Sequence, residues 1–330
     1  MADPRRVGPV SSPDVVQVPD AMRRELSPTA DGPAWLARLP ELVDRARTRW
    51  GLRLGEPFES GVAAWTAPAR TRHGEDAVVK IVFPHAEAAH EATALALWSG
   101  RGGAELLDHD ADAWTLLLRR HRPGHGLEED RPLLEQRPEA RLDVAAELLG
   151  RLHAAPVAEL SQAVTALTTC ATTAAELVRE RSQRHGPALG ADPGLLAAAA
   201  ELWEELPATA RSTVVVHGDL NPGNLVADDA TGTRTWVAID PKPMVGDPDF
   251  DPWPLLSQVA EPFRAESPVA LLRGRTRVVC AAAGLDPGRV AAWAMARAAE
   301  SALWRAAEQG DRTGALAELD QARIWSRLAV

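Results

Sequence analysis

The chain has 330 residues, of which 45% are hydrophobic and 25% charged, and its formal net charge at pH 7 is −10. This length and composition fit a globular protein with room for two lobes, and the negative charge argues against a nucleic acid partner, whose phosphates it would repel. Cys170 and Cys280 have no cysteine or histidine near them at metal-binding spacing, so we expect reduced thiols in the core. The N-terminus does not resemble a signal sequence, and no apolar run reaches the roughly 18 residues that span a bilayer. We therefore expect a cytoplasmic, monomeric protein without membrane contacts.

The first part of the chain predicts a β-rich lobe preceded by a polar leader. Residues 1–34 are rich in proline and mixed in charge, which indicates a loosely held leader segment. Residues 35–120 show first helical spacing of apolar residues and then short strand-like runs separated by polar turns, and we assign them to an N-terminal lobe. The expected elements are a helix at 35–50, strands at 62–65 and 77–83, a helix at 86–99, and strands at 105–107 and 113–118.

Beyond residue 120 the pattern becomes mainly helical. A block of strand, loop and strand at 213–240 interrupts the helices, and we assign residues 121–330 to a C-terminal lobe built around it. The whole chain is thus predicted to be a bilobal α+β protein. The expected helices cover 137–154, 159–184, 194–205 and a stretch from Asp286 to about Gly310.

The most informative segment runs from Val216 to Leu225, where an apolar strand is followed by a sharp polar turn. The turn holds Asp219 and, five residues later, Asn224; a second apolar strand then ends in Asp240. Phosphoryl transfer from ATP needs this set, because one aspartate orients and deprotonates the acceptor hydroxyl while an asparagine and a second aspartate hold Mg²⁺ on the phosphates. We therefore predict Asp219 as the catalytic base and Asn224 and Asp240 as the metal ligands.

A lysine in an apolar strand predicts where the phosphates bind. Lys80 lies within the strand at 77–83, where burying a lone ammonium is costly, and kinases use such a lysine on the α and β phosphates. We predict Glu91 as its ion-pair partner, with Glu87 one turn earlier as the alternative. No glycine-rich phosphate motif occurs, and the turn at Ser60 and Gly61 is the candidate for covering the nucleotide.

Three aspartates follow the second strand closely. Asp247, Asp249 and Asp251 alternate with proline and phenylalanine, and Trp253 comes next. One interpretation is an acidic wall beside the acceptor site, to which Trp253 also contributes. The other is an ordinary turn that caps the following helix, with Trp253 in the core.

The catalytic segment resembles that of small-molecule kinases rather than protein kinases. Gly218 stands where protein kinases carry arginine, and Asp240 is followed by Pro241 rather than by Phe-Gly. Only six residues separate Asp240 from the next turn, which leaves no room for an activation loop.

A wider set of motifs is similar to the streptomycin 6-kinase group of the aminoglycoside and hydroxyurea antibiotic-resistance kinases. The set comprises the catalytic loop, Leu107–Asp110, Leu116–Leu118, Leu152–His153 and above all the string Ala238–Pro248, and the likeness covers roughly residues 35–310. It implies a protein-kinase-like fold, with ATP and Mg²⁺ as cofactors. It also implies phosphorylation of a hydroxyl on a small cationic antibiotic, for which streptomycin, at its 6-position, is the first candidate. The N-terminal lobe would bind the nucleotide, and the C-terminal lobe would carry catalysis and bind the substrate.

Two other functions remain open. A metabolic kinase of the same fold would act on a sugar or an amino alcohol. A non-catalytic nucleotide-binding protein would be expected to lack one of Lys80, Asp219, Asn224 or Asp240, and all four are present.

The pair Arg119–Arg120 departs from related kinases, which often carry an acidic residue at that point.

Overall fold

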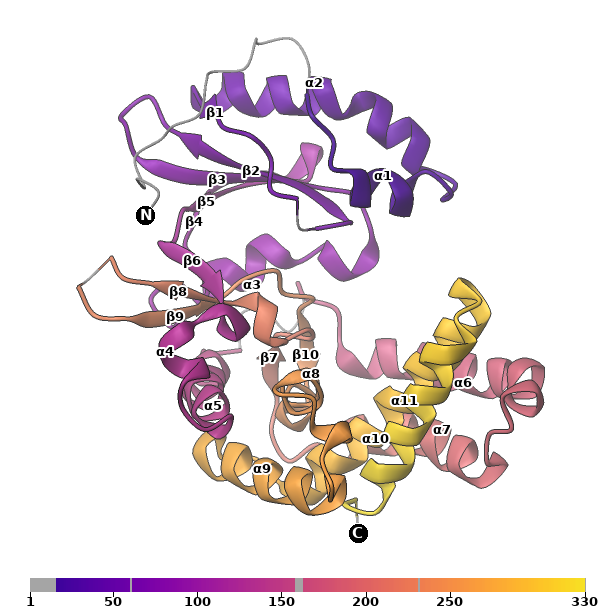
Figure 1. Ribbon diagram of the computed structural model, residues 1–330. Helices are drawn as coiled ribbons and strands as arrows, with labels where there is room; N and C mark the ends of the chain where they lie inside the picture. Colours follow the sequence, from indigo (N-terminus) through magenta and orange to yellow (C-terminus); the bar gives the residue numbers. More distant parts are fainter. Residues whose placement is uncertain (1–15, 60, 158–162, 231, 330) are drawn as a thin grey trace. The chain divides into compact units, whose positions relative to one another are not determined.

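The computed structural model describes residues 16–59, 61–157, 163–230 and 232–329 (Figure 1). The chain divides into two compact units. The sheet unit comprises the described residues up to Ala92 together with Ala104–Arg120, and the helical unit comprises Thr93–Gly103 and the described residues from His121 onward. In the described part of the chain, every helix is too short or too polar to cross a bilayer.

The sheet unit is built on a five-stranded antiparallel sheet with the strand order β1-β2-β3-β5-β4. A short polar turn at residues 71–75 joins β2 to β3, and Arg70 pairs with Asp76 at its base. Buried side chains of the sheet pack with those of two helices, α1 and α2, into one apolar core. The elements are α1 (Asp20–Leu26), α2 (Gly32–Trp50), β1 (Arg53–Leu54), β2 (Ala64–Arg70), β3 (Asp76–Val82), β4 (Leu106–Asp110) and β5 (Thr115–Arg119).

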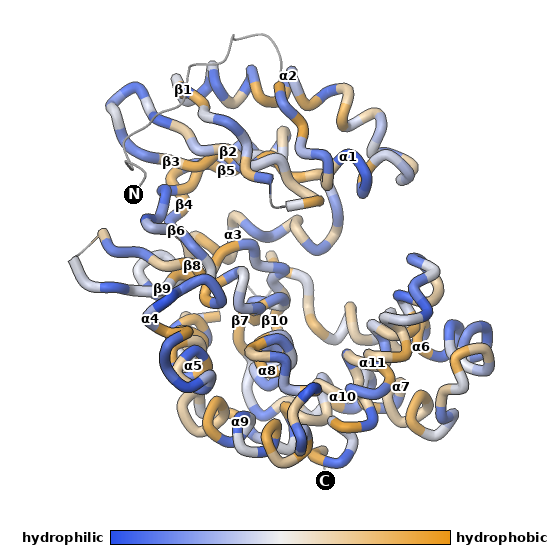
Figure 2. The backbone as a smooth tube through the Cα atoms, viewed as in Figure 1, coloured by the Kyte–Doolittle hydropathy of each residue, from blue (hydrophilic) through white to orange (hydrophobic). Residues whose placement is uncertain are grey.

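Helix α2 follows the predicted helical spacing but begins at Gly32, because Pro33 fits the first turn of a helix, where no backbone N–H is needed. It ends at Gly51, which adopts the left-handed conformation that favours glycine. Along α2 apolar and polar residues alternate within each turn (Figure 2), and Leu39 and Val43 are among those that face the core.

Part of the predicted leader is folded into the sheet unit. Residues 20–26 form α1, whose Met22 and Leu26 are buried in the core of the sheet unit, and the indole N–H of Trp65 donates to the carbonyl of Gln17 at 2.8 Å. The composition of the segment predicted a loose leader, and that expectation is wrong for residues 16–34. Two well-spaced apolar side chains are enough to hold a short helix against a sheet.

In Figure 1 the hairpin of β8 and β9 lies at the edge of the helical unit, and β7 and β10 lie further in, among the helices. A three-stranded sheet has the order β6-β8-β9, and β7 pairs with β10. The strands are β6 (Pro123–Gly126), β7 (Val214–Val216), β8 (Leu225–Asp228), β9 (Thr235–Ala238) and β10 (Met244–Gly246). The helices are α4 (Arg131–Leu134), α5 (Glu139–His153), α6 (Leu167–Leu189), α7 (Pro193–Ala208), α8 (Trp253–Gln258), α9 (Pro268–Ala283), α10 (Pro287–Trp304) and α11 (Arg312–Ser326).

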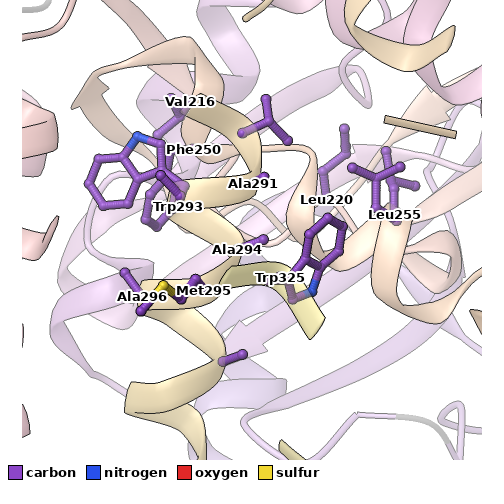
Figure 3. Close-up of a cluster of buried hydrophobic side chains, with 14 of the residues drawn as sticks. Val216, Leu220, Phe250, Leu255, Ala291, Trp293, Ala294, Met295, Ala296 and Trp325 are labelled. Carbon is purple, nitrogen blue, oxygen red and sulfur yellow. The ribbon is translucent and has the colours of Figure 1, made fainter. Parts of the chain in front are cut away.

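Helix α10 is the buried centre of this unit and packs against α6, α7 and α11. It is rich in alanine, which lets neighbouring helices approach closely. In Figure 3 its Trp293 lies against Phe250, with the two rings 5.1 Å apart and nearly perpendicular. Cys280 is also buried, and burial raises the pKa of its thiol to about 12, as expected for an unreactive core cysteine.

The stretch 93–103 was expected in the N-terminal lobe, but the structure places it in the helical unit. The helix expected at 86–99 is a single turn at Ala86–Ala88 followed by α3 (Glu91–Leu97), which starts in the sheet unit and continues into the helical unit. After α3, Trp98 is fully buried and stacks on His217, and the N–H of Ala238 donates to the carbonyl of Gly102 at 2.7 Å. These contacts attach the segment to the catalytic block.

The buried position of α1 gives a stability prediction. Replacing Met22 with alanine should lower the free energy of unfolding of the sheet unit by about 2–4 kcal/mol, because a fully buried side chain is truncated. Urea denaturation followed by circular dichroism measures this change. Arg24→Ala, on the exposed side of the same helix, is the matched control and should stay within about 0.5 kcal/mol of wild type. Equal, small effects of both substitutions would show that α1 does not contribute to the core.

Candidate active site

The catalytic loop lies between β7 and β8 of the helical unit. All three residues of β7 are buried and pair with β10, which fixes the point at which the chain turns. The turn continues through a single 3-10 turn at Pro222–Asn224, and the side chain of Asn221 accepts hydrogen bonds from the N–H groups of Gly223 and Asn224. These local hydrogen bonds stabilise the turn from within the loop itself.

The hairpin of β8 and β9 brings the two predicted metal ligands together. Leu225 pairs with Ala238, and the N–H of Ile239 donates to the carbonyl of Asn224 at 2.9 Å. Asn224 and Asp240 therefore lie at the same end of the hairpin. The Asn224 amide N–H donates to the carbonyl of Asp219 at 2.9 Å, so its amide oxygen is the atom that can bind a cation.

Asp240 has a left-handed backbone, with φ = 56°. This region is uncommon for residues other than glycine, although aspartate tolerates it better than most. The conformation turns the chain at the end of β9. A strained residue that carries a predicted metal ligand fits a functional position.

His217 supports the loop as a neutral imidazole. It is fully buried, and burial lowers the pKa of the ring below its ordinary value despite the nearby carboxylates of Asp251 and Asp219. Its Nε2–H donates to the carbonyl of Ile239 at 3.0 Å, while Nδ1 accepts the N–H of Asp219 at 3.4 Å. The ring thus connects the catalytic loop to the segment that carries Asp240, as a structural rather than a catalytic group.

Asp251 holds the start of the loop through hydrogen bonds to its backbone. Its fully buried carboxylate accepts the N–H groups of His217 and Gly218, each at 2.8 Å, and Nε2–H of His153 at 2.9 Å. Burial alone would raise the pKa of this carboxyl, but the hydrogen bond from His153 and the surrounding polar groups hold the pKa below its ordinary value. A buried carboxylate with three donors fixes the backbone direction just before Asp219.

Gly218 is required by close packing in the loop. It has φ = 81°, and a Cβ at this position would overlap the carbonyl oxygen of Lys242. Lys242 in turn donates its N–H to the carbonyl of His217 at 2.8 Å, and Arg297 of α10 donates to the carbonyl of Gly218 at 3.0 Å. The glycine in the His-Gly-Asp motif therefore leaves space for the chain that follows Asp240.

The carboxylate of Asp219 is partly exposed and has two neighbours. Its Oδ1 accepts the side-chain N–H of Asn221 at 3.2 Å, and its Oδ2 lies 3.7 Å from Nζ of Lys242. A third of the side chain reaches solvent, at 31% exposure. This geometry suits a base that must reach an incoming hydroxyl.

The structure places the predicted acidic wall inside the protein. Asp247 accepts from Nε of Arg289 at 2.6 Å and from the indole N–H of Trp293 at 2.8 Å, and Asp249 accepts the N–H of Asp286 at 2.8 Å. Both side chains are buried. The two carboxylates therefore attach the segment after β10 to the start of α10, and this placement does not fit a surface that a substrate touches.

The other two members of the predicted wall also make contacts within the helical unit. Asp251 supports the catalytic loop, as described above. The guanidinium of Arg297 lies 4.7 Å from the ring of Trp253 and 3.9 Å from that of Phe250, so Trp253 packs within the helical unit. The sequence could not separate a buried carboxylate from an exposed one, because their partners Arg289, Trp293 and His153 lie far away along the chain.

In the sheet unit, the predicted pair of Lys80 and Glu91 is present. Nζ of Lys80 lies 2.6 and 2.8 Å from the two carboxylate oxygens of Glu91, and both side chains are buried. Lys80 lies on β3 and Glu91 begins α3, so the pair joins the sheet to that helix. In the candidate glycine turn, Gly61 has φ = 115°, and Ser60 lies outside the described residues.

The chain is similar to proteins of known function. A model of the aminoglycoside/hydroxyurea antibiotic resistance kinase family matches residues 50–310. The chain is 34% identical over 307 residues to a streptomycin 6-kinase of Streptomyces griseus, a match that covers 89% of this chain and 92% of the relative. The chain belongs to this family of antibiotic resistance kinases.

One further similarity concerns the family and another concerns the fold. A hydroxyurea phosphotransferase of Kitasatospora aureofaciens is 32% identical, over 83% of this chain and 75% of the relative. A macrolide 2'-phosphotransferase of Brachybacterium faecium superposes with a TM-score of 0.55 at 18% identity, over 87% of this chain and 98% of that one. The predicted protein-kinase-like α+β fold is thereby confirmed. Membership of the family makes the protein a phosphotransferase that acts on an alcohol group and uses a nucleotide.

Sequence reasoning missed three residues around the catalytic loop of this kinase: His153, Arg297 and Lys242. His153 was part of a motif that carried the resemblance, but its partner Asp251 lies 98 residues away. Arg297 is one of many arginines and carries no local signal. Lys242 could have been found from the composition, because it is one of only two lysines in the chain.

Two buried aspartates of the kinase should respond to pH in opposite directions. Burial raises the pKa of Asp249 to about 6 from an ordinary 3.8, so the folded state keeps a proton that the unfolded state loses, and stability falls as pH rises through this window. Asp249→Asn removes this effect. The difference in the free energy of unfolding, variant minus wild type, should therefore be about 1.5 kcal/mol larger at pH 7.5 than at pH 5. The variant thus gains stability relative to wild type as the pH rises.

The control for this experiment is Asp251→Asn. The folded-state pKa of Asp251 is lowered, so its stabilisation is present above the unfolded pKa and is lost as pH falls through the folded value. This variant should therefore lose more stability at neutral than at acidic pH. Urea denaturation at several pH values measures both effects, and parallel pH curves for the two variants would contradict the assignment.

Proposed function

We propose that this kinase phosphorylates streptomycin, at its 6-hydroxyl, with ATP as donor and Mg²⁺ as cofactor, and so confers resistance. The observation that carries the acceptor is the similarity to a streptomycin 6-kinase along 92% of that protein's length. The chemistry is supported by Asp219, Asn224 and Asp240, which lie together around one loop and one hairpin end.

The residues have distinct roles in the proposed reaction. The carboxylate of Asp219 orients the acceptor hydroxyl and accepts its proton. The hydroxyl oxygen forms a bond to the γ-phosphorus, and the bond from that phosphorus to the bridging oxygen breaks, so the electron pair leaves with ADP. Lys80, paired with Glu91, is proposed to bind the donor phosphates, and the turn predicted at Ser60 and Gly61 is proposed to cover them.

The donor set fits a magnesium ion. Asn224 offers an amide oxygen and Asp240 a carboxylate, and magnesium is commonly held by one or two carboxylates together with phosphate oxygens and water. When bound, the ion neutralises charge on the phosphates. Asp251 and His217 keep the loop in place for these groups and touch neither substrate.

The charge of the chain fits a cationic acceptor. The net charge of −10 attracts a cation at long range, although the three aspartates at 247–251 do not supply a local wall. Hydroxyurea, the acceptor named for one relative, is a second candidate because that relative is 32% identical over most of both chains. A monomeric, cytoplasmic enzyme is the simplest form for this proposal.

The acceptor is tested with a panel that contains streptomycin, hydroxyurea, choline and a neutral sugar. ADP release should be stimulated by streptomycin, and mass spectrometry should show one added phosphate on it. Because the attraction is electrostatic, kcat/KM for streptomycin should fall between about 0.05 and 0.5 M salt, where the Debye length shortens from roughly 13 to 4 Å. Turnover of hydroxyurea alone, or of the neutral sugar alone, would replace streptomycin as the acceptor.

The base is tested by Asp219→Asn. We expect kcat to fall by about 10² to 10⁴, the usual loss for a positioned base, while nucleotide binding measured by calorimetry is retained. Asp44→Asn, at an exposed position on α2 in the sheet unit, controls for the change in net charge. Near-wild-type turnover by the Asp219 variant would remove this residue from the mechanism.

A further inference from the structure

The composition of the chain contains an unusual restriction. Of its 36 lysines and arginines, only two are lysines, Lys80 and Lys242. Nearly all cationic positions of the protein are therefore filled by arginine. The two lysines are the exceptions, and one of them is already the predicted phosphate-binding residue.

The second lysine lies beside the proposed base. Nζ of Lys242 is 3.7 Å from Oδ2 of Asp219, and 41% of its side chain is exposed, so the ammonium is at the open edge of the loop. The backbone of Lys242 is fixed, because its N–H donates to the carbonyl of His217 and its own carbonyl fills the space left by Gly218. It follows the predicted metal ligand Asp240 by two residues.

Arginine and lysine differ in ways that matter at this place. A guanidinium is broad and planar, with donors in a fixed fork, whereas an ammonium is a compact charge on a flexible stem. A compact cation can follow a phosphoryl group as it moves from donor to acceptor. An ordinary ion pair with Asp219 would be served equally well by arginine, which forms the other exposed ion pairs of this chain, such as those with Asp44 and Glu261.

The catalytic loop itself supplies no such charge. From His217 to Leu225 the sequence contains neither lysine nor arginine, and Arg297 is bound to the backbone carbonyls of Gly218 and Phe250. Phosphoryl transfer spreads negative charge over the equatorial oxygens of the transferring group, and positioned cations stabilise that charge.

We propose that Lys242 is a catalytic residue whose ammonium binds an oxygen of the phosphoryl group while it passes to the acceptor hydroxyl. The inference rests on the proposed function. The phosphorus–oxygen bond to the acceptor forms, the bond to the leaving ADP oxygen breaks, and the acceptor proton goes to Asp219. Lys242 stays protonated throughout and exchanges its contact with Asp219 for one with the phosphoryl oxygens.

The first test compares Lys242→Met, which keeps the length of the stem, with Lys242→Arg. Both variants should lower kcat by about 10² to 10³, Lys242→Met because the positioned charge is lost and Lys242→Arg because a broad guanidinium cannot take the place of the compact ammonium. The KM for the acceptor and the KM for the nucleotide should each change by less than about threefold. Arg264→Ala removes an exposed charge elsewhere in the helical unit and should match wild type. Near-wild-type kcat in the methionine or the arginine variant would overturn the proposal.

A second measurement does not depend on turnover. Reductive methylation with ¹³C-formaldehyde labels the exposed amines, and the signal of Lys242 is the one that is absent from Lys242→Arg. A non-hydrolysable ATP analogue with magnesium should shift the Lys242 signal clearly more than ADP does, because only the triphosphate carries the γ-phosphoryl group. Equal shifts with both nucleotides, or no shift, would show that the ammonium does not contact that group.

The two experiments separate failure of this inference from failure of the proposed function. If streptomycin is not phosphorylated but another acceptor is, the same variants are measured with that acceptor and the inference is still decided. If Asp219→Asn is inactive while Lys242→Met is fully active, the base assignment stands and the role of Lys242 is wrong. Adding methylammonium to Lys242→Ala should restore part of the lost kcat, which a purely structural lysine would not allow.

Discussion

The arrangement of the catalytic loop depends on one buried carboxylate. Asp251 is fully enclosed and accepts two consecutive backbone N–H groups, those of His217 and Gly218, together with the ring of His153. A buried charge is tolerated only when its hydrogen bonds are satisfied, so these contacts must form together. Helix α5, which carries His153, is thereby coupled to the direction in which Asp219 leaves the strand. The chemistry of the loop is thus coupled to the packing of the helical unit.

The remaining predicted groups of the helical unit come from one short stretch of chain. The hairpin of β8 and β9 brings Asn224 and Asp240 together, and the bond between Lys242 and the carbonyl of His217 returns the chain to the loop. Base, metal ligands and the proposed second lysine therefore lie within 24 residues, from Asp219 to Lys242. The local hydrogen bonds arrange these groups relative to one another, and the contacts of Asp251 attach them to the helices.

The sequence was informative where chemistry imposes a spacing. The five-residue interval from Asp219 to Asn224, the strand that ends at Asp240, and the lysine in an apolar strand all follow from what phosphoryl transfer requires, and the ion pair of Lys80 with Glu91 is present as predicted. For the acidic run the sequence left two interpretations open, because alternation with proline describes a turn but not what faces it. Asp247, for example, is bound by Arg289 and Trp293, which lie more than 40 residues further along the chain. Similarly, the proline-rich composition of the leader concealed the two apolar side chains that hold α1.

The scarcity of lysine has a practical consequence for inhibitor design. A covalent inhibitor that targets amines would meet two side chains in the whole protein, and one of them, Lys80, is buried against Glu91. Lys242 is the more accessible of the two and lies beside Asp219. An aldehyde or activated ester carried on an antibiotic-like scaffold would therefore react where it blocks turnover, with almost no competing surface sites. Replacing Lys242 by arginine to escape such a compound would, on the inference above, also remove the activity that gives resistance.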